Sequence, residues 1–482
     1  MPFGAAKAAL LGAAGSAGSD PGWVVQPYSD TTGSSPVYWV YDMAVASDDS
    51  VWITSLTNFS GNGVIFHIEP DGTIGSANDQ KEMDPTQSGN YGGRGLCMAD
   101  NGDLVTIGGG PIHDGTPRTG CLTAAYTPGT LIQDWDNSVF YPINTPMYAY
   151  QTGITSKGSS VYGTAYFYEG ITRYDTIMFK LSLTDGSVET LNGSANTLHL
   201  YGSNYINTYG GSACVSTDAS ANDWFYIQYR NTSGGIGVQG VQIGAATYMA
   251  RIYFPTSGTT LGVGGVCEAD ADNLYFTFGD PTNKKFHLLK VAKSDGAIQW
   301  QRKVTIGSST AGFDRLTPPV TDSSGNIYCV WNSQDTQQFA GANGSVHWAK
   351  WDSSGNIQTL DGTTLNTLTT AEANPVYPMR AEITSDDKYI YIAGSFTAGQ
   401  RPFLAKLPTD GSGTDNTTPL SGTFPGSDPL YYKNNLTHTE AAGDATQSTL
   451  GSQSTGNVSA YTGQLEDSVA QANPAVYLDE VV

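Results

Sequence analysis

The chain has 482 residues, of which 44 are Asp or Glu and 22 are Lys or Arg, so its formal net charge is −22. Nucleic-acid binding is disfavoured, because phosphate contacts need clustered Lys and Arg. Anionic membrane surfaces are disfavoured for the same reason. The acidity indicates solubility and not any particular fold.

The chain opens with a segment of small residues, from Met1 to Ser19, that contains one Lys. One interpretation is a weak secretory signal, which combines a basic residue with a short apolar stretch. The apolar part holds only two Leu among Ala and Gly, which is poor for membrane insertion. We favour the second interpretation, in which residues 1–22 anchor the chain in an assembly. No run of 18 apolar residues occurs, so no membrane span is expected.

A two-part motif returns seven times between residues 41 and 411. Its first part is a polar turn followed by an alternating strand, at 47–53, 100–105, 157–162, 222–226, 270–275, 323–328 and 386–391. Its second part is a strand that ends in a turn, most clearly at 66–72, 179–186, 289–296, 348–355 and 404–411. Weaker copies of the second part end at Pro128-Gly129 and Ser257-Gly258.

This repeat predicts the architecture. A unit of about 50–60 residues with several short strands is typical of a radial array of small sheets. Its Asp-Gly and Ser-Gly pairs supply the positive φ that tight hairpins need. Helical periodicity is nearly absent, and 58 glycines fit a chain with many turns. We therefore predict an all-β fold, a seven-bladed β-propeller over residues 23–411 with a short N-terminal anchor segment and an extended C-terminal tail.

Two details of the ring are predicted from position. The segment Trp23 to Ser29 precedes the first unit, so we expect it to supply a strand to the seventh blade and close the ring. The fourth unit carries a Gly-rich insertion, from Ser233 to Gly237. We expect this insertion to form a long loop on one rim of the disc.

Residues 412–482 differ in composition from the repeats. A polar run from Thr437 to Ser459 is almost free of bulky apolar residues, and the chain ends with Val476-Tyr477-Leu478 and Val481-Val482. A polar run of this kind is disordered when alone, because it cannot bury enough surface. Two interpretations stay open: the apolar end docks on a neighbouring subunit, or the extension is a flexible tail.

The sequence contains no recognisable catalytic or metal-binding motif. Its six histidines show no H-x-x-x-H spacing, and no G-x-S-x-G elbow or Walker loop occurs. We therefore predict no catalytic, cofactor-binding or metal-site residues, no cofactor and no enzymatic activity. The five cysteines are expected to be free thiols in core strands, because no C-x-x-C pair exists and their number is odd: Cys97, Cys121, Cys214, Cys267 and Cys329.

Two other groups of residues have alternative explanations. Glu268, Asp270 and Asp272 offer oxygen ligands for calcium, but Asp-rich hairpin turns explain them equally well. The abundant aromatic residues, 28 Tyr and 9 Trp, are expected mainly in the core between blades. Some of them are expected to line a sugar-binding face, since Tyr and Trp combine a flat apolar ring with a polar tip.

The two ends of the chain carry a family resemblance. The opening, Met1-Pro2-Phe3-Gly4-Ala5-Ala6-Lys7-Ala8-Ala9-Leu10-Leu11-Gly12-Ala13-Ala14-Gly15, resembles the start of virion structural proteins of tailed bacteriophages, particularly marine ones. The Ser/Thr/Gly/Asp-rich stretch after Gly411 is similar in style. The resemblance implies a component of the virion tail that binds other virion proteins through its N-terminal segment and C-terminal tail. No functional residue is carried over from it.

We accordingly expect a non-enzymatic, tail-fibre-like appendage, homo-oligomeric within the particle, whose rim loops contact a host-surface glycan. The first alternative is an internal tail component, such as a nozzle or hub, or a capsid decoration protein. The second is a secreted bacterial propeller, either a lectin or a carbohydrate-active enzyme. The second alternative predicts cleavage within about the first 25 residues.

Overall fold

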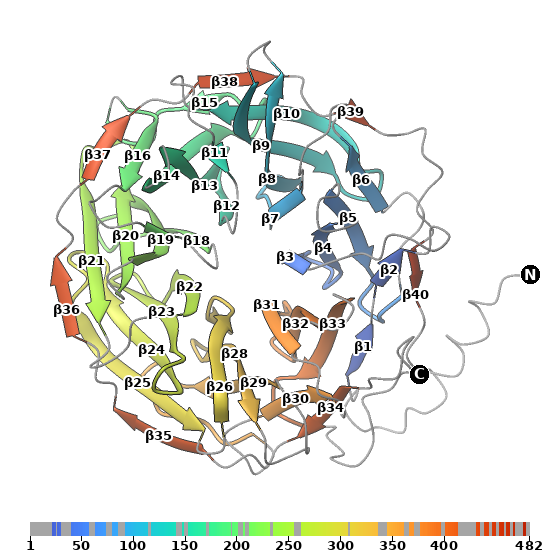
Figure 1. Cartoon of the computed structure of the whole chain (residues 1–482), viewed down its shortest axis with the longest axis vertical. Helices are drawn as coiled ribbons and strands as arrows, with labels where there is room; N and C mark the ends of the chain where they lie inside the picture. The colour runs from blue at the N-terminus through green and yellow to red at the C-terminus, as the bar shows by residue number, and fades with distance from the viewer. Residues whose placement is uncertain are drawn as a thin grey trace, which may run out of the picture.

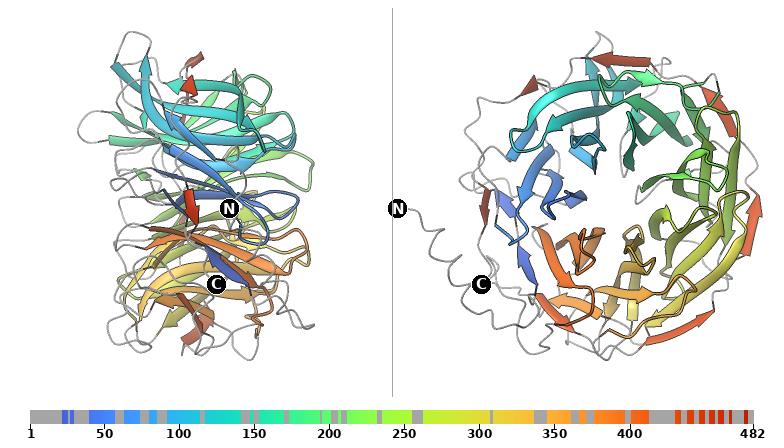
Figure 2. Two further views of the ribbon diagram at one scale, coloured as in Figure 1. Left: turned by 90° about the vertical axis from the view of Figure 1, so that its right-hand side faces the viewer. Right: turned by 180° about the vertical axis from the view of Figure 1, so that it is seen from behind.

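A computed structural model of the chain shows antiparallel meanders arranged in a ring about a common axis (Figure 1). Seen from the side, the ring is a thick disc (Figure 2). The described part of the chain contains seven such meanders and no helix, which confirms the predicted seven-bladed β-propeller. The structure describes residues 22–25, 27–29, 40–56, 63–73, 80–84, 92–113, 117–140, 147–148, 153–169, 173–193, 195–200, 206–207, 212–231, 235–254, 262–306, 309–335, 345–360, 366–370, 376–396, 401–412, 430–433, 438–442, 446–449, 453–456, 459–462, 466–467 and 476–478.

Blades 1 to 4 take up the first half of the ring, each running from the axis outward. Blade 1 contains β3 (Val40–Val45), β4 (Val51–Leu56), β5 (Gly63–Ile68) and β6 (Gln80–Asp84). Blade 2 contains β7 (Gly92–Met98), β8 (Leu104–His113), β9 (Pro117–Thr127) and β10 (Ile132–Phe140). Blade 3 contains β11 (Met147–Tyr148), β12 (Ile154–Lys157), β13 (Ser160–Glu169), β14 (Arg173–Ser182), β15 (Val188–Glu189) and β16 (Thr197–Leu200). Blade 4 contains β17 (Ile206–Asn207), β18 (Ala213–Thr217), β19 (Asp223–Asn231), β20 (Ile236–Gln242) and β21 (Tyr248–Phe254).

Blades 5 to 7 complete the ring. Blade 5 contains β22 (Gly262–Glu268), β23 (Asn273–Asp280), β24 (Lys285–Ala292) and β25 (Ile298–Ile306). Blade 6 contains β26 (Ser309–Leu316), β27 (Val320–Thr321), β28 (Ile327–Asp335), β29 (Ser345–Trp351) and β30 (Asn366–Thr370). Blade 7 contains β31 (Val376–Ile383), β32 (Tyr389–Phe396) and β33 (Arg401–Pro408).

The N-terminal strand β1 (Trp23–Val25) closes the ring. It pairs antiparallel with β33 as the fourth strand of blade 7, with Trp23 opposite Lys406 and Val25 opposite Leu404. The predicted closing strand is thus confirmed for these three residues. The next strand, β2 (Pro27–Ser29), pairs instead with the last strand of the chain, β40 (Val476–Leu478). Residues 1–21 of the predicted anchor lie outside the described residues.

The C-terminal extension circles the disc. Its strands lie along the rim in Figure 1 and run back from blade 6 to blade 1, each antiparallel to the outermost strand of one blade. We call this series the strap: β34 (Leu430–Lys433), β35 (His438–Ala442), β36 (Thr446–Thr449), β37 (Gln453–Gly456), β38 (Ser459–Thr462) and β39 (Glu466–Asp467), followed by β40. The strands that the extension forms pair with blades of the same chain. Neither the docking nor the flexible-tail interpretation anticipates this.

The core lies between blades. The buried apolar residues within the described ranges form seven clusters, one for each pair of neighbouring blades. Trp52 of blade 1, for example, shares a cluster with Leu104 and Tyr126 of blade 2. The expectation that the aromatic residues fill the core is confirmed for the largest fully buried side chains: Trp52, Trp331, Trp348, Trp351, Tyr126, Tyr226, Tyr229, Tyr253, Tyr275, Tyr328 and Tyr391.

The two parts of the sequence motif meet across neighbouring strands. In four blades an aromatic residue of the second strand lies directly opposite a lysine of the third, as Tyr328 lies opposite Lys350. The Lys350 ammonium is 4.9 Å from the centroid of the Tyr328 ring, a cation–π contact. In blade 1 the corresponding pair, Trp52 and His67, is stacked at 4.3 Å. The two parts of the motif therefore contribute the two members of a cross-strand pair in each of these blades.

The glycines of the motif supply left-handed backbone. A glycine with positive φ follows the third strand in every blade of the described ring: Gly72, Gly129, Gly186, Gly244, Gly296, Gly355 and Gly411. In blade 4 this turn contains Gly244, and Ser257-Gly258 lies outside the described residues. The predicted end of the fourth repeat is therefore wrong, because β21 already begins at Tyr248.

The predicted long loop in blade 4 is wrong at its last two residues, while Ser233 and Gly234 lie outside the described residues. Ile236 and Gly237 belong to β20 and pair with Arg230 and Tyr229 of β19. These two residues therefore belong to a strand and not to a loop. Gly237 is needed because a Cβ there would lie 2.0 Å from Cζ of the Tyr229 ring.

Candidate functional site

One face of the disc gathers the polar turns of the motif. The turn after the first strand and the turn after the third strand of a blade are joined by backbone hydrogen bonds. The Leu183 N–H donates to Ser159 O at 2.8 Å, and the Lys293 N–H donates to Asp272 O at 2.8 Å. The two sets of turns therefore share one face, which we call the tight-turn face.

The repeated aspartates of this face cap their own turns. The Asp71 carboxylate accepts from the Thr73 N–H at 2.9 Å, and the Asp352 carboxylate accepts from the Ser354 N–H at 2.9 Å. This is an Asx turn, in which a short side chain replaces a backbone acceptor. Hydrogen bonds from the Asn222 and Ser220 N–H groups and from the Asn222 and Trp224 side chains lower the pKa of Asp218 to about 2. Part of the excess of acidic residues is therefore explained by aspartates that stabilise turns.

Some turn aspartates also connect blades. The Gly158 N–H of blade 3 donates to Asp100 of blade 2 at 2.7 Å. The Ser385 N–H of blade 7 donates to Asp49 of blade 1 at 2.7 Å. Charge-assisted bonds of this type are stronger than neutral ones, so these carboxylates hold neighbouring blades together.

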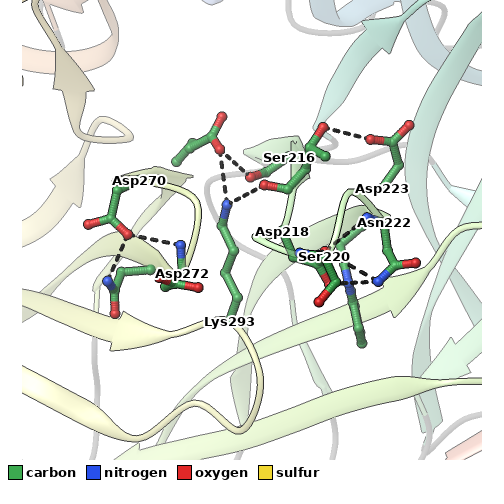
Figure 3. Close-up of polar contacts among 12 residues, drawn as sticks. Ser216, Asp218, Ser220, Asn222, Asp223, Asp270, Asp272 and Lys293 are labelled. Carbon is green, nitrogen blue, oxygen red and sulfur yellow. Dashed lines mark hydrogen bonds and ion pairs between the residues drawn. The ribbon is translucent and has the colours of Figure 1, made fainter.

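A group of charged and polar residues on this face connects blades 3, 4 and 5, and Figure 3 labels three of its members, Ser216, Asp223 and Lys293. Lys293 rises between the inner turns of blades 4 and 5, with Asp270 on one side and Asp218 and Asp223 on the other. We call its members the charged cluster: Lys157, Ser216, Thr217, Asp223, Glu268 and Lys293.

Lys293 is the buried centre of the charged cluster, with a side chain that is 3% exposed. Its ammonium donates to the Glu268 carboxylate at 3.0 Å and to the backbone oxygen of Thr217 at 3.0 Å. The Ser216 hydroxyl donates to the same Glu268 oxygen at 2.7 Å. A buried ammonium needs this number of partners, since an unpaired charge is costly to desolvate. Lys293 thereby ties blade 5 to blade 4.

A second link runs from blade 3 to blade 4. The Lys157 ammonium lies 2.6 Å from the Asp223 carboxylate and also contacts the Thr217 hydroxyl. Burial alone would raise the pKa of Asp223, but the hydrogen bonds from Lys157 and Thr217 lower it. The charged cluster therefore spans three blades, and pairing with Lys157 and Thr217 favours the ionised form of Asp223.

A buried ion pair links the first and last blades. Asp42, 5% exposed, accepts from its neighbour Met43 N–H and from the Leu96 N–H of blade 2, both at 2.9 Å. The Arg380 guanidinium of blade 7 lies 3.5 Å from Asp42 and 2.7 Å from Glu382. Burial raises the pKa of Asp42 to about 6, although Arg380 and the two backbone N–H groups act in the opposite direction.

The acidic residues considered for calcium are already bonded within the protein. Asp270 lies 2.8 Å from the Lys290 ammonium and accepts from the Asp272 N–H, while Glu268 pairs with Lys293. Among the described residues, no group of three or more His, Cys, Asp or Glu is arranged to hold a metal ion. The hairpin-turn explanation accounts for the observed bonds.

The five cysteines are free, as predicted. Cys121 and Cys329 are buried and the other three are half-buried. Burial raises the pKa of Cys214 to about 12, so its thiol stays protonated at neutral pH and is a poor nucleophile. The cysteines thus pack as small apolar groups.

Sequence reasoning missed the charged cluster and the Asp42–Arg380 pair. Their members come from different blades, and no local spacing identifies which blades meet. The sugar-binding face stays a prediction, because much of the densest aromatic part of the sequence lies outside the described residues: Tyr38, Trp39, Tyr150, Tyr201, Tyr205 and Tyr209. A helix that could span a membrane is absent from the described residues.

No protein-family model and no curated protein matches the chain. Among solved structures, it is similar to the Dos1 propeller, with a TM-score of 0.42 and 9% identity over 79% of this chain and 81% of that one. It is similar to an α-L-arabinanase of Penicillium chrysogenum, solved with arabinobiose, with a TM-score of 0.37 and 12% identity over 65% and 93% of the two chains. A protein of unknown function from Dyadobacter fermentans gives a TM-score of 0.44 and 8% identity over 80% and 98%. These likenesses concern the fold alone.

Proposed function

We propose that the protein is a non-enzymatic structural component of a tailed bacteriophage particle, a tail appendage whose disc faces the host. The observation that supports the non-enzymatic part is the pairing of the charged groups described above. Catalysis needs ionisable groups that face a substrate. Here Lys293, Glu268, Asp42 and Arg380 bond to one another or to backbone groups, mostly across blade boundaries.

The strap supports a role in an exposed particle. A closed propeller already resists opening, and a chain segment that pairs with six blades adds a second closure around the rim. Segments open locally when few bonds hold them. A double closure therefore protects the chain against proteases outside a cell, where a tail appendage works.

The proposal assigns attachment to the N-terminal segment. Residues 430–478 contribute strands to their own disc, so residues 1–22 are the better candidate for contact with other virion proteins. The resemblance of residues 1–15 to virion proteins supports the same assignment. The disc then presents its rim loops, where a host-surface glycan binds and several copies act together.

Mass spectrometry of purified particles tests the proposal. We expect this chain at a fixed copy number in the particle, and its absence would refute the idea. A variant lacking Met1 to Ser19 should fold normally but fail to join the particle. A matched variant lacking residues 479–482 should join it as the full chain does.

Two measurements separate the alternatives. N-terminal sequencing of the mature chain should find an intact or Met-trimmed start, whereas cleavage within about the first 25 residues would support a secreted propeller. Images of labelled particles should place the protein on the outside of the tail. A glycan array then tests host-surface binding, and hydrolysis of any arrayed glycan would contradict the non-enzymatic assignment.

A further inference from the structure

The strap is held unevenly along its length. The antiparallel ladders have five register pairs at β35 and four at each of β34, β36, β37 and β38. The ladder on blade 1 has only two, Glu466 opposite Asp84 and Asp467 opposite Met83. Main-chain pairing stabilises a strand in proportion to its length, so the blade 1 junction is the weakest of the described strap ladders.

The register adds a second weakness at the same junction. It places Glu466 directly opposite Asp84, and like charges directly opposite each other destabilise an antiparallel pair. No other register pair of the described strap ladders opposes two acidic residues. The strap therefore has a defined point at which opening is easiest.

The end of the strap beyond this junction is fastened separately. Strand β40 pairs with β2 through Val476, Tyr477 and Leu478, opposite Ser29, Tyr28 and Pro27. Strand β2 follows β1, the strand that closes blade 7, after a single residue. The β2–β40 sheet thus connects the end of the strap to the strand that closes the ring.

We propose that the β2–β40 sheet is the clasp of a strap that opens in order, from blade 1 back toward blade 6. With the clasp shut, β39 is held at both ends and its short ladder persists. With the clasp open, β39 becomes a free end with two opposed acidic residues, and it separates first. Strand β38 separates next, and then β37 and the earlier strands of the strap in turn. Each separation exposes the outer edge of one blade. This inference is independent of the proposed function.

A reversible cross-link tests the clasp in the full chain. Tyr28 and Tyr477 are directly opposite, at a spacing that a disulfide can bridge, so Tyr28→Cys/Tyr477→Cys locks the clasp under oxidising conditions. Hydrogen–deuterium exchange should show β39 amides exchanging about tenfold more slowly when the lock is oxidised than when it is reduced. The unmodified chain, treated with the same reductant, is the control. Equal exchange in the two states of the lock would overturn the proposal.

Deletion of residues 476–482 tests the order of opening. Exchange should rise at β39 and β38 and at their partners β6 and β10, and stay unchanged at β34 and β35. Deletion of residues 479–482 keeps the clasp and should change nothing. Adding Glu466→Lys to the longer deletion should restore part of the protection at β39. A uniform rise in exchange along the whole strap would show that the strap opens as a single cooperative unit, and would refute ordered opening. If the longer deletion fails to fold, the double-cysteine variant tests the proposal instead.

Discussion

Glycines that lie opposite aromatic residues are a recurring device of this chain at the scale of single residues. A Cβ on Gly240 would lie 2.4 Å from Cε1 of Tyr226, its cross-strand partner. The Tyr226 ring lies over Gly240 of the neighbouring strand, because the glycine has no side chain there. This arrangement covers the backbone at the glycine and fills the space between blades. The same arrangement recurs in other pairs: Gly163 with Phe179, Gly237 with Tyr229, and Gly394 with Phe403.

Gly240→Ala should therefore lower the free energy of unfolding by about 1–3 kcal/mol, because the added methyl displaces a buried ring. Denaturant titration measures the loss. In a Tyr226→Leu background the same change should cost nothing or stabilise, since alanine restricts the unfolded chain more than glycine does. An equal loss in the two backgrounds would show that the ring is not the cause.

Asp42 gives the molecule a pH dependence that a single residue controls. Burial raises its pKa from the ordinary value of 3.8 to about 6, so within that interval the folded state binds more protons than the unfolded state. The free energy of unfolding therefore falls as pH rises through this window. Asp42→Asn removes the titration. The variant should gain about 2–3 kcal/mol relative to the unmodified chain between about pH 4 and about pH 7.

Urea titrations across this pH range measure the difference, and Asp134→Asn is the matched control because Asp134 is exposed. The control should follow the pH profile of the unmodified chain. Parallel profiles for Asp42→Asn and the unmodified chain would contradict the assigned titration. Below this window the sign reverses, because turn carboxylates with a lowered pKa, such as Asp218, lose their stabilising charge as pH falls toward 2.

At the scale of the element, the turn after the third strand is the most regular feature of the blades. Gly296 has φ of 72°, in the left-handed region that β-branched residues avoid. Gly296→Val should lower the free energy of unfolding by about 1–3 kcal/mol. Gly296→Asn should cost less, because asparagine tolerates this conformation. Thermal and denaturant unfolding compare the two variants, and equal losses would show that backbone conformation is not the reason.

The elements that sequence reasoning predicted are those with local signals. Turn residues and alternating strands recur at each blade, and the pair Tyr328–Lys350 stands at a fixed place in both parts of the motif. Blade 4 departs from this rule because its turn at Gly244 lacks the aspartate found in the clear copies. The charged cluster could not be predicted, because the contact of Lys293 with Thr217 depends on which blades become neighbours after closure.

At the scale of the whole molecule, the strap shows a second reason why sequence reasoning fell short of the structure. Its strands are short, and apart from β34 they are mostly polar, so they lack the apolar alternation by which a strand is recognised. Composition alone therefore indicated that the C-terminal extension is disordered. Composition does not show that the outermost strand of each of these blades has an unpaired edge to which another strand can bind. Six outermost strands offer such edges: β6, β10, β16, β21, β25 and β30.

The strap also covers edges that would otherwise pair with other molecules. The outermost strands β21 and β25 are long and rich in β-branched and aromatic residues, and an uncovered edge of this kind is prone to aggregation. Deleting residues 413–482 keeps β1 and the ring closure but exposes all six edges. We expect a folded disc that associates edge to edge, because strand pairing between discs replaces the pairing that the strap provided.

Light scattering after size exclusion measures this association as a function of concentration. A peptide of residues 430–482, added in trans, should return the truncated disc to the size of the full chain, because it supplies the missing strands to the same edges. A peptide of the same composition in scrambled order should not. A truncated chain that stays monomeric at every concentration would mean that the blades do not need cover. The strap would then reinforce a ring that β1 already closes, and would not protect the edges of the blades.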